Sequence, residues 1–189
     1  MKNPLQLMCA DVYLNNIPQK DQRQFVYIAK PIGGNSHPLL AWGAYASHYV
    51  QTIENLRVTN DISALSTFAN KFDWQNDLNE LLFNDIYDGL VLTDMNLVIK
   101  WVNKGFSEMT GYSAKYAVGK TPRFLQGKST SEKTRASIRE KIASNKPFRE
   151  VVSNYRKNSE EYECEIFACP LRSKSGEYTH YLALEKEVK

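Results

Sequence analysis

The spacing of apolar residues changes once along the chain, near residue 75. Before that point apolar residues recur every three or four positions, which is the period of a helix packed on one side. Helices are expected over residues 21–30, 37–57, 61–72 and 75–86. Asp61 is a candidate N-cap for the third helix, whose apolar stripe comprises Ile62, Leu65, Ala69 and Phe72. The stretch IGGNSHP, residues 32–38, predicts a break rich in turns.

After residue 88 apolar and polar residues follow shorter periods, interrupted by helical stretches. Strands are expected over residues 89–94, 97–103, 147–157, 161–172 and 178–188. Helices are expected over residues 104–111, 113–119 and 131–145, the first two ending at Gly111 and Gly119. The short connections KNSE and SKSGE join the last three strands as hairpins.

This order of elements predicts an α+β fold, with a five-stranded antiparallel sheet and short helices on one face. The space between sheet and helices would form a small-molecule pocket. We expect a helical N-terminal extension or cap over residues 1–75 and the sheet domain over residues 76–189. The chain ends directly after the last strand, so we expect no effector domain and an output through contact with a partner.

Composition narrows the function classes. With 24 Lys and Arg against 21 Asp and Glu, the net charge of +3 does not indicate nucleic-acid binding. No apolar run reaches the ~18 residues of a membrane helix, and the N-terminus lacks the apolar segment of a signal peptide. A cytoplasmic location is therefore expected. Cys9, Cys164 and Cys169 lack metal-ligand spacing, so we expect free buried thiols.

Catalytic motifs do not emerge from the sequence. Asp, Glu and His are not arranged with a serine or cysteine as a hydrolytic set, and there is no glycine-rich phosphate loop. The three histidines share no ligand spacing with each other or with the cysteines. We therefore expect a binding protein and not an enzyme.

Several stretches resemble a PAS domain, namely GLVLTDMNLVIKWVNKGFSEMTGYSAKYAVGK, RFLQG and NYRKNSEEYECEIFACPLRSKSGEYTHYLAL. RFLQG narrows the likeness to the LOV branch, whose members bind flavin mononucleotide (FMN) and form a cysteinyl adduct in blue light. The resemblance begins near Asp85 and does not include the helical N-terminal part. It argues against haem binding, because a haem-binding PAS domain needs an axial histidine in this helical region and residues 105–146 contain no histidine.

The LOV branch carries its reactive cysteine immediately before the arginine of RFLQG, where this chain has Pro122. Proline offers no nucleophile and no backbone donor. Cys164 and Cys169 belong to the fourth predicted strand, away from the segment that contains Pro122. The resemblance therefore implies that adduct chemistry is lost.

Some of the family's flavin contacts are kept. The resemblance implies that Arg123 and Arg139 contact the ligand phosphate, that Gln126 lies near the ribityl chain and that Asn154 reads the flavin ring. The alternative for both arginines is a surface ion pair with an acid such as Glu132 or Glu140. Phe124 and Leu125 are expected in the core, and Gly127 is expected at a turn with a positive φ.

Other contacts are altered, because Thr121, Cys164 and Glu185 replace two asparagines and a glutamine of the family. An amide offers both donors and acceptors to a flavin edge, whereas a thiol is weak in both roles. With a strand period of two, Tyr181, Ala183 and Glu185 share one face, and a buried carboxylate there would have a raised pKa. The favoured alternative is that the strand end frays and Glu185 is solvated.

The sequence thus predicts a PAS-type signalling module whose pocket is empty or holds an unidentified small ligand. The alternative is a sensor that binds FMN or FAD without forming an adduct. The partner would be a second copy or another signalling protein. Trp42, Tyr45 and Tyr49 could form a dimer face, although such a stripe is more often intramolecular core.

Overall fold

The computed structural model describes residues 38–188, with side chains described from residue 48 onward. In chain order the elements are α3 (Pro38–Phe72), α4 (Leu78–Phe83), β1 (Gly89–Asp94), β2 (Ile99–Val102), α5 (Lys104–Thr110), α6 (Ala114–Ala117), the 3-10 helix η1 (Pro122–Leu125), α7 (Glu132–Ala143), β3 (Phe148–Tyr155), β4 (Glu161–Arg172) and β5 (Tyr178–Val188). The helix predicted over residues 21–30, the break before Pro38 and Cys9 lie outside the described residues.

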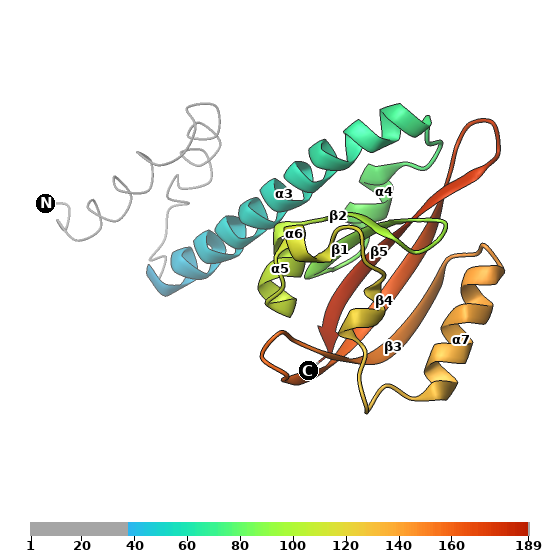
Figure 1. The fold of residues 1–189 in the computed structure, drawn as a ribbon. Coiled ribbons are helices and arrows are strands. Elements are labelled where there is room, and N and C mark those ends of the chain that lie inside the picture. Colours follow the sequence, from blue (N-terminus) through green and yellow to red (C-terminus); the bar gives the residue numbers. More distant parts are fainter. Residues whose placement is uncertain (1–37, 189) are drawn as a thin grey trace, which may run out of the picture. The chain divides into compact units, whose positions relative to one another are not determined.

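The five strands form one sheet in the order β2-β1-β5-β4-β3, and each neighbouring pair is antiparallel (Figure 1). This confirms the predicted α+β fold. The last strand in sequence, β5, lies in the centre of the sheet and pairs with β1 on one side and β4 on the other. Residues up to Glu185 are paired on both sides, and β5 continues to Val188 along β4 alone.

One face of the sheet is covered by the second part of α3 and by α4. Their buried residues join those of β1, β4 and β5 in one apolar cluster: Val58, Leu65, Trp74, Leu78, Leu82, Tyr87, Leu90, Leu92, Leu171, Leu182 and Leu184. We call this face the outer face. The stripe of Ile62, Leu65, Ala69 and Phe72 packs into this cluster, as predicted.

The opposite, inner face meets the helices between β2 and β3. Val91, Ile99, Val102, Phe106, Ala117 and Leu125 form a second buried cluster on this side. The alternation along β5 is as predicted, because Ala183 packs with the inner cluster while Leu182 and Leu184 belong to the outer one. Helix α7 lies alongside β3, away from the other short helices (Figure 1).

The break predicted between residues 57 and 61 is wrong, because α3 is continuous from Pro38 to Phe72. The segment VTND contains neither proline nor glycine, so nothing in it ends a helix. Asp61 is therefore not an N-cap. It is buried, and its Oδ2 accepts hydrogen bonds from the Tyr87 hydroxyl (3.0 Å) and from Nδ2 of Asn103 (2.9 Å).

The hydrogen bond from Asn103 to Asp61 connects α3 to the start of α5. Asn103 is the N-cap of α5, and its Oδ1 accepts from the backbone N–H groups of Leu90 and Phe106, each at 2.9 Å. Helix α4 is shorter than expected and is capped by Asp77. By its contacts the chain divides into residues 1–55 and 56–189, so the second part of α3 packs with the sheet. The predicted domain boundary at residue 75 stays a prediction.

Candidate functional site

A pocket of about 620 Å³ lies on the inner face of the sheet, beside η1 and α7. This volume is within the range of small-molecule sites, ~300–1,000 Å³. Strands β1, β4 and β5 contribute Val91, Thr93, Ile166, Ala168, Tyr181, Ala183 and Glu185. The opposite wall includes Thr121, Pro122, Arg123, Gln126, Glu132, Arg135, Ile138, Arg139 and Ile142. The sheet side of the pocket is thus mainly apolar, whereas most of these residues on the opposite wall are polar or charged.

Local structure explains how η1 presents its residues. Gly119 has a φ of 87°, a backbone conformation that favours glycine, and it redirects the chain after α6. Pro122 then begins the 3-10 helix, where a missing backbone N–H costs little. Leu125 is buried in the inner cluster and Phe124 packs against it, as predicted. Pro122 and Arg123 remain on the side of the pocket.

Gly127 is required for a reason other than the predicted one, because it does not have a positive φ. A Cβ at this position would overlap the ring of Tyr155. The need is therefore space for a close approach between chain segments.

Five of the seven predicted site residues line the pocket: Thr121, Arg123, Gln126, Arg139 and Glu185. Asn154 and Cys164 are buried beside it, outside the lining. Asn154 pairs through its backbone with Gln126 in an isolated β-bridge. Cys164 belongs to a small cluster with Met109 and Tyr162. The ligand-binding roles of all seven stay predictions.

Glu185 is the most unusual residue of the wall. The expectation of a solvated strand end is wrong, since Glu185 is only 2% exposed. It lies between Gly89 of β1 and Ile166 of β4, in the centre of the sheet. Burial raises the pKa of its carboxyl from 4.5 to about 7. Among the described residues its Oε2 has no hydrogen-bond partner.

Two further polar atoms of the wall share this property within residues 38–188. The hydroxyl of Thr93 and Nε of Arg135 are buried and lack hydrogen-bond partners there. Buried polar atoms are normally hydrogen-bonded, and an unmade bond costs about 1–3 kcal/mol. Unsatisfied atoms on a pocket wall are therefore suited to contact a bound polar molecule.

The arginines lie at the α7 side of the pocket. Nη2 of Arg139 contacts Oε1 of Glu132 at 2.8 Å, which is the surface pairing considered as the alternative to phosphate binding. Arg123 makes no ion pair with any acid of residues 38–188. Arg135, which also lines the pocket, was not among the site residues predicted from the sequence. The helical spacing of Arg135, Ile138, Arg139 and Ile142 would have placed it on the same side of α7.

One end of α7 is tied to the sheet by Tyr181. Its hydroxyl is 2.7 Å from the backbone oxygen of Ile142 and 2.7 Å from Oδ1 of Asn145. Both partners belong to the C-terminal end of α7 or directly follow it. This contact holds α7 against the pocket at a fixed distance from β5.

No thiol of residues 38–188 belongs to the pocket wall. Cys169 pairs with Leu182 in the β4–β5 ladder and shares its outer side of the sheet. Cys164 is fully buried, and its burial raises the pKa of the thiol. At neutral pH this thiol is protonated and therefore a poor nucleophile. Pro122, where the LOV branch has its reactive cysteine, is part of the wall.

Neither membrane-spanning helices nor clustered metal ligands are present in the part of the chain that the structure describes. None of its helices combines the length and apolar character needed to cross a bilayer. Its His, Cys, Asp and Glu side chains do not gather in groups of three or more around a common point.

A family model of the PAS domain matches residues 88–188. The chain belongs to the PAS-domain family. This PAS protein is 30% identical over 135 residues to a blue-light-activated histidine kinase of Rhizobium johnstonii, an alignment that covers 70% of this chain and 39% of that relative. The chain thus matches well under half of the kinase.

Solved structures support the narrower likeness. The light-state structure of the blue-light photoreceptor Aureochrome1 LOV matches with a TM-score of 0.53 and 28% identity, over 60% of this chain and 90% of that chain. The light-state dimer of the fungal blue-light photoreceptor Vivid matches with a TM-score of 0.50 and 27% identity, over 51% and 75% of the respective chains. The predicted resemblance of the PAS protein to LOV photoreceptors is confirmed.

Proposed function

We propose that this PAS protein is a cytoplasmic sensory module that binds a small molecule non-covalently and signals through contact with a partner. It does not form a cysteinyl-flavin adduct and does not act as an enzyme. The observation that carries this proposal is Pro122 in the wall of a 620 Å³ pocket that no described thiol lines. The similarity to blue-light photoreceptors supports the sensory role.

The pocket is suited to a polar heteroaromatic ligand. Thr93 and Glu185 bring buried polar atoms that have no hydrogen-bond partner among residues 38–188 to the sheet side of the pocket. A protonated carboxyl both donates and accepts a hydrogen bond, so Glu185 in that form resembles an amide. Such a group matches a ring edge that carries an N–H beside a carbonyl.

Flavin is the second candidate for the ligand. Arg123, Gln126 and Arg139 line the pocket together, and these are the positions that the LOV resemblance assigns to the phosphate and ribityl contacts. A flavin bound here would supply light absorption and redox chemistry. The protein would hold its ring between the sheet and η1 and would provide no covalent partner for it.

We also propose that the PAS protein forms a homodimer through α3. Tyr49, Val50, Ile53 and Leu56 are large apolar residues on this helix with about half of their surface exposed. Exposed apolar residues at helical spacing favour a partner helix. The similarity to a dimeric photoreceptor supports this assembly. Light scattering at several concentrations tests it, and a monomer at every concentration would contradict it.

The first experiment on the pocket is a titration of the purified chain with FMN, followed by flavin fluorescence and by absorption near ~450 nm. Saturable binding is expected if flavin is the ligand. The bound chain is then illuminated under native conditions without added reductant, and its absorption near ~450 nm is followed in the light and after return to the dark. We expect no light-induced bleaching that recovers in the dark. A light-dependent flavin adduct in the wild-type chain would refute the proposal.

A gain-of-function variant tests the position of Pro122. In FMN-loaded Pro122→Cys, combined with Thr121→Asn, blue light is expected to bleach the absorption near ~450 nm reversibly, because the sulfur would enter the pocket wall. Pro122→Ser combined with Thr121→Asn is the matched control, since it removes the proline ring without adding sulfur. A flavin-loaded cysteine variant that does not bleach would show that residue 122 does not face the ring.

A further inference from the structure

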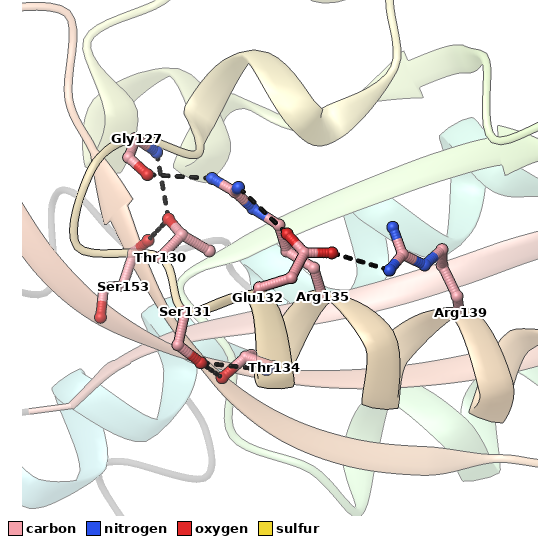
Figure 2. Close-up of polar contacts among 8 residues, drawn as sticks. All are labelled: Gly127, Thr130, Ser131, Glu132, Thr134, Arg135, Arg139 and Ser153. Carbon is pink, nitrogen blue, oxygen red and sulfur yellow. Dashed lines mark hydrogen bonds and ion pairs between the residues drawn. The ribbon is translucent and has the colours of Figure 1, made fainter.

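Glu132 lies between two arginines of the pocket wall (Figure 2). Its Oε1 contacts Nη2 of Arg139 at 2.8 Å, and its Oε2 contacts Nη1 of Arg135 at 3.5 Å. Both carboxylate oxygens are therefore engaged by guanidinium groups. Glu132 thus occupies the cationic positions that an anionic ligand would use.

The start of α7 holds Glu132 in this position. Ser131 is the N-cap, and its Oγ accepts from the backbone N–H of Thr134 at 3.0 Å. Glu132 is the first residue of the helix, so Arg135 follows one turn later and Arg139 two turns later. The hydrogen bond from Arg139 lowers the pKa of Glu132, with a smaller contribution from Arg135. Glu132 is therefore negatively charged at neutral pH.

Arg135 is fixed from its other side. Its Nη2 donates to the backbone oxygen of Gly127 at 2.9 Å, and Thr130 accepts from the backbone N–H of the same glycine at 3.0 Å. The hydroxyl of Thr130 also donates to the backbone oxygen of Ser153 (Figure 2). Because this network anchors the loop before α7 to β3, Arg135 has little freedom to follow a ligand.

Arg123 is the arginine of the pocket wall that has no acidic partner among the described residues. Glu150 also lines the pocket, but Lys141 contacts it at 2.5 Å. A phosphomonoester would have to take Arg139 from Glu132 and then lie beside the displaced carboxylate. A ligand with an uncharged tail would meet neither obstacle.

We infer that Glu132 is a specificity-determining residue, an internal anion that reduces the preference of the pocket for phosphorylated ligands over their uncharged counterparts. This inference rests on the proposed binding of a small molecule in the pocket. It assigns the favoured ligands to the class of polar heteroaromatic molecules whose tail does not carry a doubly charged phosphate. Removing the charge of Glu132 would restore the phosphate preference.

The expected effect is moderate because the site is open to solvent. The side chains of Glu132 and Arg139 are 69% and 55% exposed. Exposed ion pairs are weak, and the interaction of one carboxylate with a phosphate of nearly two charges is screened by water. We therefore expect Glu132→Gln to raise the affinity for a phosphorylated ligand by about three- to tenfold relative to its uncharged counterpart.

The experiment compares riboflavin with FMN, which share one ring and differ in the phosphate. Dissociation constants for both are measured with the wild type, Glu132→Gln and Glu140→Gln. The last variant is the matched control, because Glu140 belongs to the same helix but does not line the pocket. The ratio of the two constants should shift towards FMN only in Glu132→Gln. This shift should shrink between about 50 mM and about 500 mM salt.

Two results would overturn the inference. One is an equal change in both affinities, which would mean that Glu132 acts through the structure of α7. The other is an equal shift in both variants, which would mean that the net charge of the helix is responsible.

Failure of both flavins to bind would reject the flavin candidate, and a second measurement then decides on Glu132. Inorganic phosphate is titrated into the full chain while the side-chain Nε–H signals of its arginines are followed by NMR. Tighter phosphate binding at Arg135 and Arg139 in Glu132→Gln than in the wild type would support the inference. Identical titrations would overturn it.

Discussion

Replacing Glu185 with glutamine should make the stability of the protein less dependent on pH. Glu185 is 2% exposed in the centre of the sheet, and burial raises the pKa of its carboxyl to about 7. In the unfolded chain the same group titrates near its ordinary value of 4.5. Between these two values the folded protein binds a proton that the unfolded chain has released.

The sign of the effect follows from this difference in proton binding. The free energy of unfolding falls wherever the folded state binds more protons, so it should fall as the pH rises from about 4.5 to about 7 and then level off. The full difference between the two pKa values corresponds to about 3 kcal/mol. Between about pH 5 and about pH 8, Glu185 should account for a loss of about 2–3 kcal/mol.

Urea unfolding of the ligand-free protein at these two pH values measures the effect. The wild type should lose about 2–3 kcal/mol more stability than Glu185→Gln on going to the higher pH. The control is Glu163→Gln, which removes an exposed carboxylate from the neighbouring strand β4. If the wild type and Glu185→Gln respond equally to pH, Glu185 is not a buried carboxyl of raised pKa.

Two further substitutions test how the fold is held together. Asp61→Ala removes the acceptor of the Tyr87 hydroxyl and of Asn103, so urea unfolding should show that the free energy of unfolding falls by about 3 kcal/mol. Asp61→Asn keeps one acceptor oxygen and should cause a smaller loss of stability. Equal losses in the two variants would contradict this account. Gly105→Ala would place a Cβ on the backbone oxygen of Asp88, so we expect the free energy of unfolding to fall by several kcal/mol. A variant as stable as the wild type would show that the chain segments around Gly105 and Asp88 separate easily.

The sequence was sufficient for those features that depend on local alternation. The two-residue period around Ala183 correctly predicted which β5 residues face the inner and outer clusters, because both faces of the sheet are buried. The RFLQG motif likewise singled out Arg123 and Gln126, which line the pocket, although no helix was predicted over Pro122–Leu125. In both cases the relevant information lies within a few neighbouring residues.

The errors concern residues whose roles are set by distant partners. Asp61 has the chemistry of a helix cap, and only its contacts with Tyr87 and Asn103 show that it is a buried tertiary acceptor. Glu185 is followed by charged residues, so a solvated end was reasonable until β1 and β4 were found on either side. The pairing of Arg139 with Glu132 was one of two alternatives that the sequence left open, and the structure shows this pairing.

The cover that α3 provides for the outer face limits where the PAS protein can be shortened. Residues 88–188 match the family, yet Leu90, Leu92, Leu182 and Leu184 pack in one cluster with Val58 and Leu65 of the preceding helix. A fragment that begins at residue 88 would expose these leucines to water and should aggregate. The minimal folding unit is therefore expected to begin near residue 56, some thirty residues before the region that the family model matches.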